Sequence, residues 1–209
     1  MEYDALLGNE TKNRIKEIEN NEDCDEVELG TICDINPESL TKNQFSQINY
    51  IDISSVKEGK INNIQLLTEN FPSRAQRIIK KNDILFSTVR PNLKGYTFIN
   101  EEIKNGIATS GFVVIRSKTI HPKYIYSLLT NDIIIDFLMA NSTGTNYPAV
   151  NSNVFEKIKI KIPKNKKLIK HLEPLFIEID KLLIEIKEVK SQYDKLIKEL
   201  SEDAIPINK

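Results

Sequence analysis

A regular apolar repeat near the end of the chain restricts its fold more than any other feature of the sequence. Between residues 168 and 200, apolar residues recur at alternating steps of four and three, a spacing that predicts one face of a long amphipathic helix. At about 1.5 Å per residue, this helix would be roughly 50 Å long. Most of the preceding sequence reads as short strands, so we expect the repeat to be buried by a partner helix. We take its residues as the candidate dimerisation seam: Leu168, Leu172, Leu175, Ile179, Leu182, Ile186, Val189, Tyr193, Leu196 and Leu200.

The apolar face of the predicted helix is wider than a two-stranded seam requires. With Leu172 at heptad position a, a further apolar column falls at position e, formed by Ile169, Phe176, Leu183 and Ile197. A face three columns wide is typical of multi-helix bundles, so we expect the e column to contact more than a single dimer mate. Pro174 should kink the first turns of this helix or delay its start.

Length and composition set the broad class of the protein. With 209 residues, 40% of them hydrophobic, the chain can hold one core of ordinary size and a helical appendage. No apolar run approaches the roughly 18 residues of a membrane span, and residues 1–4 are acidic where a signal peptide would be positive. We therefore expect a cytoplasmic protein that does not contact a membrane. Cys24 and Cys33 are too few for a disulfide framework or a zinc site, so we expect reduced thiols.

The net charge of −1 conceals an uneven distribution of charge. Residues 1–30 contain ten acidic and three basic residues, a balance of −7, so residues 31–209 carry +6. Four of the five arginines lie between residues 74 and 116. The guanidinium fork suits phosphates and guanine edges better than the point charge of lysine does. A basic body of this kind favours a polyanionic partner, with a solvated basic surface as the alternative.

Ahead of the long helix, the sequence reads as short strands separated by turns, with one helix at about residues 122–139. Expected strands occupy residues 28–35, 50–53, 61–67, 84–87, 96–100 and 111–116. The fold class we expect is α+β, with a strand-rich domain followed by a long coiled-coil-type helix. We divide the chain into an acidic leader or helix over 1–26, the strand-rich domain over 27–163 and the C-terminal helical region over 164–209.

The residue patterns of catalytic sites are scarce in this sequence. His121 and His171 have no cysteine or carboxylate cluster at metal-ligand spacing, so we expect no metal site. No glycine-rich loop fits a phosphate or S-adenosylmethionine. Asp52 with Glu58 and Lys60, or Asp83 with Glu102 and Lys104, resembles a Mg²⁺-dependent nuclease site only loosely. Residues 57–60 fit a hairpin turn better, and we expect a protein that is not an enzyme.

Polar, cationic loops are more informative. Residues 71–98 contain six cations and one acid, and loops over 71–77, 87–96 and 142–147 offer guanidinium, amide and hydroxyl groups to bases and phosphates. The candidate DNA-binding residues are Arg74, Gln76, Arg77, Ser87, Thr88, Arg90, Asn92, Lys94, Tyr96, Ser110, Thr143, Thr145, Asn146 and Tyr147.

Each of these assignments has a structural alternative. Tyr96 could belong to the core, Arg77 could pair with Asp83, and the 142–147 loop could simply lead into the last strand. Alternating lysines at 157, 159 and 161 share one face of a predicted strand. They could follow a phosphate backbone, but a solvated face or a guarded sheet edge is the simpler interpretation.

The order of several segments resembles a known family. In sequence, these are Val27-Glu28-Leu29-Gly30, Tyr50-Ile51-Asp52-Ile53, Pro72-Ser73-Arg74-Ala75-Gln76-Arg77, Lys81 to Pro91, Ala108-Thr109-Ser110-Gly111-Phe112 and Ile160-Lys161-Ile162-Pro163 before a long helix. Together they resemble the DNA specificity subunit of type I restriction-modification systems, in a half-length form with one target recognition domain and one conserved-region helix.

The resemblance implies a function and a set of partners. Residues 27–163 would be a target recognition domain for double-stranded DNA, and the helix a spacer on which modification (methyltransferase) subunits dock. The restriction subunit would join through the complex. S-adenosylmethionine, ATP and Mg²⁺ would act only in those partner subunits, so we expect no cofactor in this chain. Family members usually carry two such units, so a single unit suggests a homodimer with an interrupted palindromic target.

Two other functions remain open at this stage. The chain could be the specificity component of a combined cleavage and methylation system, or an orphan or inhibitory half-subunit that interacts through its helix alone.

Overall fold

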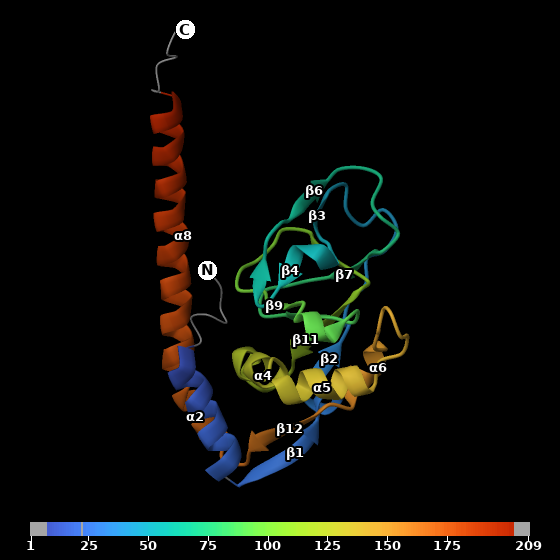
Figure 1. Cartoon of the computed structure of the whole chain (residues 1–209), viewed down its shortest axis with the longest axis vertical. Helices are drawn as coiled ribbons and strands as arrows, with labels where there is room; N and C mark the ends of the chain where they lie inside the picture. The colour runs from blue at the N-terminus through green and yellow to red at the C-terminus, as the bar shows by residue number, and fades with distance from the viewer. Residues whose placement is uncertain (1–7, 22, 203–209) are drawn as a thin grey trace.

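The computed structural model describes residues 8–21 and 23–202 and shows a mixed body beside one long helix, α8 (Glu173–Glu202) (Figure 1). In the described part of the chain before this helix, twelve short strands form four small sheets. The expected α+β class, a strand-rich region followed by a long helix, is therefore confirmed. Within the described residues, none of the helices combines the length and the apolar character that a bilayer crossing requires.

The central sheet is antiparallel, with strand order β2-β11-β8-β9, and both of its faces are buried. Alternate residues of one strand pack into different core clusters: Ile84 and Phe86 belong to the large cluster, and Leu85 belongs to the smaller second cluster. Burial on both faces explains why these strands are continuously apolar rather than alternating. The bounds are β2 (Cys33–Ile35), β8 (Ile84–Ser87), β9 (Tyr96–Phe98) and β11 (Phe112–Ser117).

A second four-stranded sheet has the order β6-β3-β10-β7 and includes one parallel pair, β3 with β10. Its strands are β3 (Ile48–Ile51), β6 (Gln65–Leu67), β7 (Ala75–Ile78) and β10 (Gly106–Thr109). Between β3 and β6 lie the short helix η1 (Ile53–Ser55) and a two-stranded hairpin of β4 (Val56–Lys57) and β5 (Lys60–Ile61). The hairpin expected at residues 57–60 is thus present, with Glu58 and Gly59 at positive φ in its turn.

Helices α4 (Pro122–Leu129) and α5 (Asp132–Ala140) supply most of the helical residues of the large core cluster. The single helix expected over 122–139 is wrong, because the chain breaks at Thr130 and Asn131. The Asn131 side chain accepts a hydrogen bond from the amide of Ile133 at 3.2 Å and caps a new helix there. Apolar periodicity continues through this break, so it does not reveal the cap.

The N-terminal segment packs onto the body. Helix α2 (Gly8–Asn21) buries Ile15, and β1 (Cys24–Glu28) pairs antiparallel with β12 (Lys159–Pro163), across the position between 26 and 27 where we divided the chain. In β12, Lys159 and Lys161 face solvent while Ile160 and Ile162 are buried, as the alternation predicts. The Lys159 ammonium lies 3.2 Å from Glu26. The remaining short elements are α3 (Leu29–Ile32), η2 (Pro91–Leu93) and α6 (Ser152–Glu156).

Within the described residues, the contacts between the long helix and the body lie along the first half of the helix. A short helix, α7 (Lys167–His171), precedes it, and α8 begins at Glu173, so Pro174 delays the start as expected. Ile169, Phe176 and Ile179 are buried in the large core cluster. The e-column residues Ile169 and Phe176 thus have contacts other than a dimer mate, and this chain's own body provides them.

Two ion pairs hold α8 against the body one heptad apart. The buried ammonium of Lys123 on α4 is paired with Asp180 and donates to the carbonyl oxygen of Phe176 at 3.2 Å. Further along, the Lys187 ammonium lies 2.9 Å from Glu101. The last turns of the helix extend past the body (Figure 1). Sequence periodicity identifies the apolar face of a helix, but it does not tell which half of that face the same chain will cover.

Candidate nucleic-acid interface

Main-chain hydrogen bonds tie the three candidate loops together at one end of the strands. The amide of Ser110 donates to the carbonyl of Arg74 at 2.7 Å, and the amide of Thr88 donates to the carbonyl of Gly111 at 2.9 Å. The amide of Val150 in turn donates to the carbonyl of Thr88 at 2.9 Å. Segments 72–77, 87–90, 109–111 and 143–150 therefore form one continuous edge, which we call the loop edge.

At one end of the loop edge, Arg74 is exposed but held in place. Its Nη2 atom lies 2.7 Å from Oδ2 of Asp52, and the side chain is 61% exposed. Burial alone would raise the pKa of Asp52, but hydrogen bonds from Ser54 and Tyr50 and the charge of Arg74 outweigh it and lower that pKa. Asp52 thus stays ionised and fixes the position of the Arg74 side chain, which remains largely exposed.

The neighbouring residues of β7 differ in availability. Gln76 is exposed, and its Nε2 donates to the carbonyl of Ser73 at 2.9 Å. Arg77 is partly buried, its Nε is buried without a hydrogen-bond partner, and burial lowers its pKa. The alternative pairing of Arg77 with Asp83 does not form, because Asp83 binds Arg116 instead. An orphaned buried donor of this kind gains from an acceptor supplied by a ligand.

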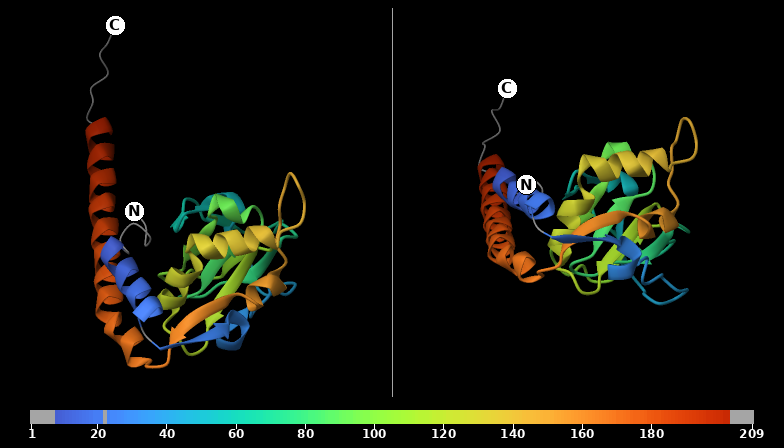
Figure 2. Two further views of the ribbon diagram at one scale, coloured as in Figure 1. Left: turned by 60° about the horizontal axis from the view of Figure 1, so that its bottom comes forward. Right: turned by 90° about the horizontal axis from the view of Figure 1, so that it is seen from below.

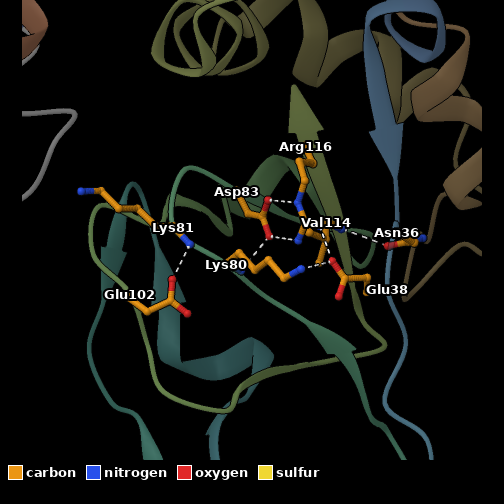
Figure 3. A network of polar contacts seen from close by, with 8 residues as sticks. All are labelled: Asn36, Glu38, Lys80, Lys81, Asp83, Glu102, Val114 and Arg116. Carbon is orange, nitrogen blue, oxygen red and sulfur yellow. Dashed lines mark hydrogen bonds and ion pairs between the residues drawn. The ribbon is translucent and has the colours of Figure 1, made fainter. Parts of the chain in front are cut away.

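Asp83 sits in a polar network that links the two larger sheets to the segment after β2 (Figure 3). Arg116 donates hydrogen bonds to both carboxylate oxygens of Asp83, at 2.7 and 2.8 Å. Arg116 also forms an ion pair with Glu38, and Glu38 forms a second ion pair with Lys80. A carboxylate already bound in this way is not free to hold Mg²⁺. Among the described residues, no group of three His, Cys, Asp or Glu side chains is arranged to bind a metal ion.

At the other end of the loop edge, Arg90 and Tyr147 form a stacked pair. The guanidinium carbon lies 4.2 Å from the centre of the Tyr147 ring. Arg90 Nη2 donates to the carbonyl of Asn146 at 3.3 Å, and the Arg90 amide donates to the carbonyl of Pro148 at 2.7 Å. The 87–96 and 142–147 loops are therefore in contact, as one candidate interface requires.

The other candidate residues divide into exposed and internal groups. Asn92, Thr145 and Asn146 are exposed, Ser110 is partly buried, and Thr143 is exposed and bridges to Ala149. Lys94 forms an ion pair with Asp132 at 2.8 Å.

Three further candidates serve the fold. The Thr88 hydroxyl donates to the carbonyl of Gly111 at 2.9 Å. The Ser87 hydroxyl donates to the carbonyl of Val89 at 2.7 Å. Ser87 is 2% exposed and Tyr96 is 5% exposed, with the Tyr96 ring packed against Phe86 and Tyr126. Ser87 and Tyr96 are therefore structural residues, and neither presents its side chain at the surface.

One polar segment beside the loop edge is not among the residues predicted from the sequence. Residues 39–46 pair with β7 through the amide of Leu40 and the carbonyl of Gln76, at 2.8 Å. Together with residues 68–73, 75 and 76 they line a groove of about 760 Å³. Thr41, Asn43 and Gln44 lie in its wall. The signal was a run rich in hydroxyls and amides, but that composition is equally typical of an ordinary loop.

The candidate seam residues of the helix fall into two groups. Leu172 and Ile179 are buried, and Leu168, Leu175 and Ile186 are partly buried. The exposed group lies in the second half of the helix, except for Leu182, which is in the first half and only 36% exposed. The exposed fractions of the others are 64% for Val189, 61% for Tyr193, 52% for Leu196 and 60% for Leu200. A large exposed apolar stripe of this kind marks an interaction surface.

Comparisons with known proteins identify the family. A family model described as "Type I restriction modification DNA specificity domain" matches residues 21–190. The type I restriction enzyme HindI specificity subunit of Haemophilus influenzae is 23% identical over 166 residues, covering 76% of this chain and 36% of that protein.

Solved structures agree with this match. The HsdS subunit from Thermoanaerobacter tengcongensis superposes with a TM-score of 0.61 at 26% identity, covering 89% of this chain and 51% of that one. A chain from work on complex assembly and conformational transition of the type I R-M system gives 0.60 at 27% identity, with the same coverage. This chain spans about half, or less, of the length of these relatives. It belongs to the type I restriction-modification DNA specificity family.

Proposed function

We propose that this chain is one DNA-reading unit of a type I restriction-modification complex and directs partner subunits to an interrupted DNA site. The observation that carries the proposal is the loop edge, where main-chain hydrogen bonds tie together the segments that hold Arg74, Gln76, Arg90 and Asn146, on a chain of this family. Arginines and amides fixed on one edge suit base edges and phosphates.

The unit works by binding and positioning, and the chemistry belongs to its partners. The specificity subunit is not the catalytic subunit, and modification subunits would supply methyl transfer with S-adenosylmethionine. The restriction subunit, which uses ATP and Mg²⁺, would join through the complex. The Asp52 and Asp83 carboxylates are engaged by Arg74 and Arg116, so they support positioning of arginines rather than hydrolysis.

The second half of α8 supports pairing with a second copy of the unit. Its exposed stripe of Val189, Tyr193, Leu196 and Leu200 lies beyond the part of the helix that the body covers. Two copies related by a two-fold axis would bury this stripe and place two loop edges at a fixed separation. The resulting DNA target would be an interrupted palindrome.

Selection from randomised DNA duplexes tests this function. The purified chain should enrich an interrupted palindrome, and Arg74→Ala together with Arg90→Ala should abolish enrichment while the fold is retained. Enrichment of a single uninterrupted half-site would contradict the two-copy arrangement but not DNA recognition. No enrichment at any salt concentration would overturn the function itself. The chain incubated with Mg²⁺ should leave the enriched duplex intact.

A further inference from the structure

Tyr147 is an unusually exposed aromatic residue in an unusually well-fixed position. Its side chain is 69% exposed, although aromatic rings of this size normally bury most of their surface. It lies in the loop between α5 and α6, which stands out from the body (Figure 2). The isolated bridge between Thr143 and Ala149, with main-chain hydrogen bonds of 2.8 and 2.9 Å, closes the base of this loop.

Arg90 holds the Tyr147 ring from one side. Its guanidinium carbon is 4.2 Å from the ring centre, within the range of a cation–π contact, and its Nη2 also donates to Asn146 beside the ring. Stacking and hydrogen bonding together restrict both long side chains. The ring is therefore a flat surface presented in a fixed orientation. Its conformational entropy is already reduced in the free protein, so less is lost when a ligand binds.

The backbone of Arg90 adds a second observation. This residue adopts φ +49° and ψ 63°, the left-handed conformation that residues other than glycine rarely adopt. It persists because the amide of Arg90 is bound to Pro148 and its carbonyl to the amide of Leu93. Strain of this kind concentrates at sites that bind ligands. The side chain of this same residue contacts Tyr147 in the 142–147 loop.

We propose that Tyr147 stacks on a base of the bound duplex at a step that it partly unstacks, and that Arg90 is its positioning residue. This role rests on the proposed DNA-reading function and specifies how one loop performs it. An exposed aromatic ring is attractive to the face of any base, whereas sequence preference arises because some steps unstack more easily than others. Tyr147 thus contributes to target choice through DNA deformation, while Arg74 and Gln76 lie where hydrogen-bond readout is possible.

The absence of tryptophan from the sequence provides a clean reporter. Tyr147→Trp places the chain's one indole in the loop, and Ile177→Trp places it at an exposed position of α8 outside the proposed pairing stripe as the control. Titration with the duplexes enriched in the selection above should quench the emission of the Tyr147→Trp variant strongly and leave that of the control unchanged. Equal emission with and without bound duplex in Tyr147→Trp would overturn the stacking.

A second measurement follows the DNA. With 2-aminopurine placed at each position of an enriched duplex in turn, the wild-type chain should raise its fluorescence at one step of each half-site. Tyr147→Ala should remove that rise and weaken binding roughly 5- to 150-fold. Tyr147→Phe should keep the rise, and Arg90→Gln should reduce it, although Tyr147 is still present.

The outcomes separate the role of Tyr147 from the function of the unit. Wild-type affinity in Tyr147→Ala, or no step with raised 2-aminopurine fluorescence, would overturn base stacking while DNA recognition stands. Failure of the wild-type chain to bind or enrich any duplex would overturn the DNA-reading function and the stacking with it.

Discussion

Arg116 grips Asp83 through two parallel hydrogen bonds, from Nε to Oδ1 at 2.7 Å and from Nη2 to Oδ2 at 2.8 Å. Asp83 is fully buried, and the amide of Lys80 donates to the same carboxylate at 2.8 Å. The hydrogen bonds that Arg116 itself donates, chiefly those to Asp83, raise the pKa of Arg116 above its usual value. Arg116 also binds Glu38, so one residue joins β11, the turn before β8 and the segment that leads into residues 39–46.

Replacing Arg116 should therefore destabilise the whole body. In Arg116→Met, the buried Asp83 carboxylate loses its charged partner, and we expect the free energy of unfolding to fall by about 3 kcal/mol. Urea unfolding followed by circular dichroism measures the change. The matched control is Lys187→Met, which breaks an exposed ion pair with Glu101 and should cost at most about 1 kcal/mol. Similar losses in the two variants would contradict a special role for the Asp83 pair.

Much of the fold could be predicted because local patterns and burial agree. The alternation at Ile160, Lys161 and Ile162 predicts a strand with one buried face, and β12 has it. The continuous apolar run at residues 84–86 predicts a strand buried on both sides, which β8 is. The break at Asn131 could not be predicted, because the apolar period favours one continuous helix while the Asn131 side chain favours a new helix start. One polar residue inside that period does not show which of the two forms.

The candidate site could be predicted only as a set of loops. Arg74, Gln76 and Arg90 were selected for their chemistry, which is visible in sequence. Ser87 and Tyr96 have similar chemistry but lie inside the fold, and nothing in a short polar loop distinguishes inward from outward side chains. The partner of Arg77 was also unpredictable, since Arg116, 33 residues beyond Asp83, takes that carboxylate.

Arg74 offers a test of phosphate or base contact at the loop edge. Arg74→Gln keeps a polar side chain but removes one charge, so we expect weaker binding to the enriched duplex. A phosphate contact would also make the dependence of log K on log salt shallower by about one unit for all sequences. A base contact would cost about 1–3 kcal/mol and relax selectivity at one position. Fluorescence anisotropy across a salt series separates these results.

The control for this measurement is Lys159→Gln. Lys159 is exposed on β12 and paired with Glu26, in the strand where alternating lysines could have followed a phosphate backbone. We expect this variant to bind DNA with the affinity and salt slope of the wild type. A slope as shallow as that of Arg74→Gln would instead place β12 on the DNA.

His121 should make stability depend on pH. Its ring stacks on Phe176 of α8 with centroids 4.8 Å apart, and its Nδ1 is buried without a hydrogen-bond partner. Burial, followed by the charge of Lys123, lowers the pKa of His121 below its usual 6.5, although Glu173 and Asp180 act in the opposite direction. The unfolded chain therefore takes up a proton first as the pH falls.

The sign of the effect follows from this difference in pKa. Stability due to neutral His121 is complete above about pH 6.5 and is lost as the pH falls toward the lower, folded-state pKa. Thermal unfolding between pH 7.5 and 5.5 should show a falling midpoint in the wild type. His121→Gln should flatten that fall, whereas His171→Gln, at an exposed position on α7, should not. An unchanged slope in His121→Gln would contradict the assignment.

The body-covered residues and the more exposed residues of the apolar repeat should respond to mutation differently. Leu182→Glu with Ile186→Glu, or Val189→Glu with Leu196→Glu further out, places charge on the face proposed for a second copy, so sedimentation should show monomers. Val189 and Leu196 are 64% and 52% exposed, so the second pair should leave the thermal midpoint unchanged. Phe176→Ala empties a buried site in the first half and should cost about 3–5 kcal/mol of stability. A Val189→Glu and Leu196→Glu variant that remained dimeric would show that this stripe does not join two copies, and the spacing between two loop edges would then need another origin.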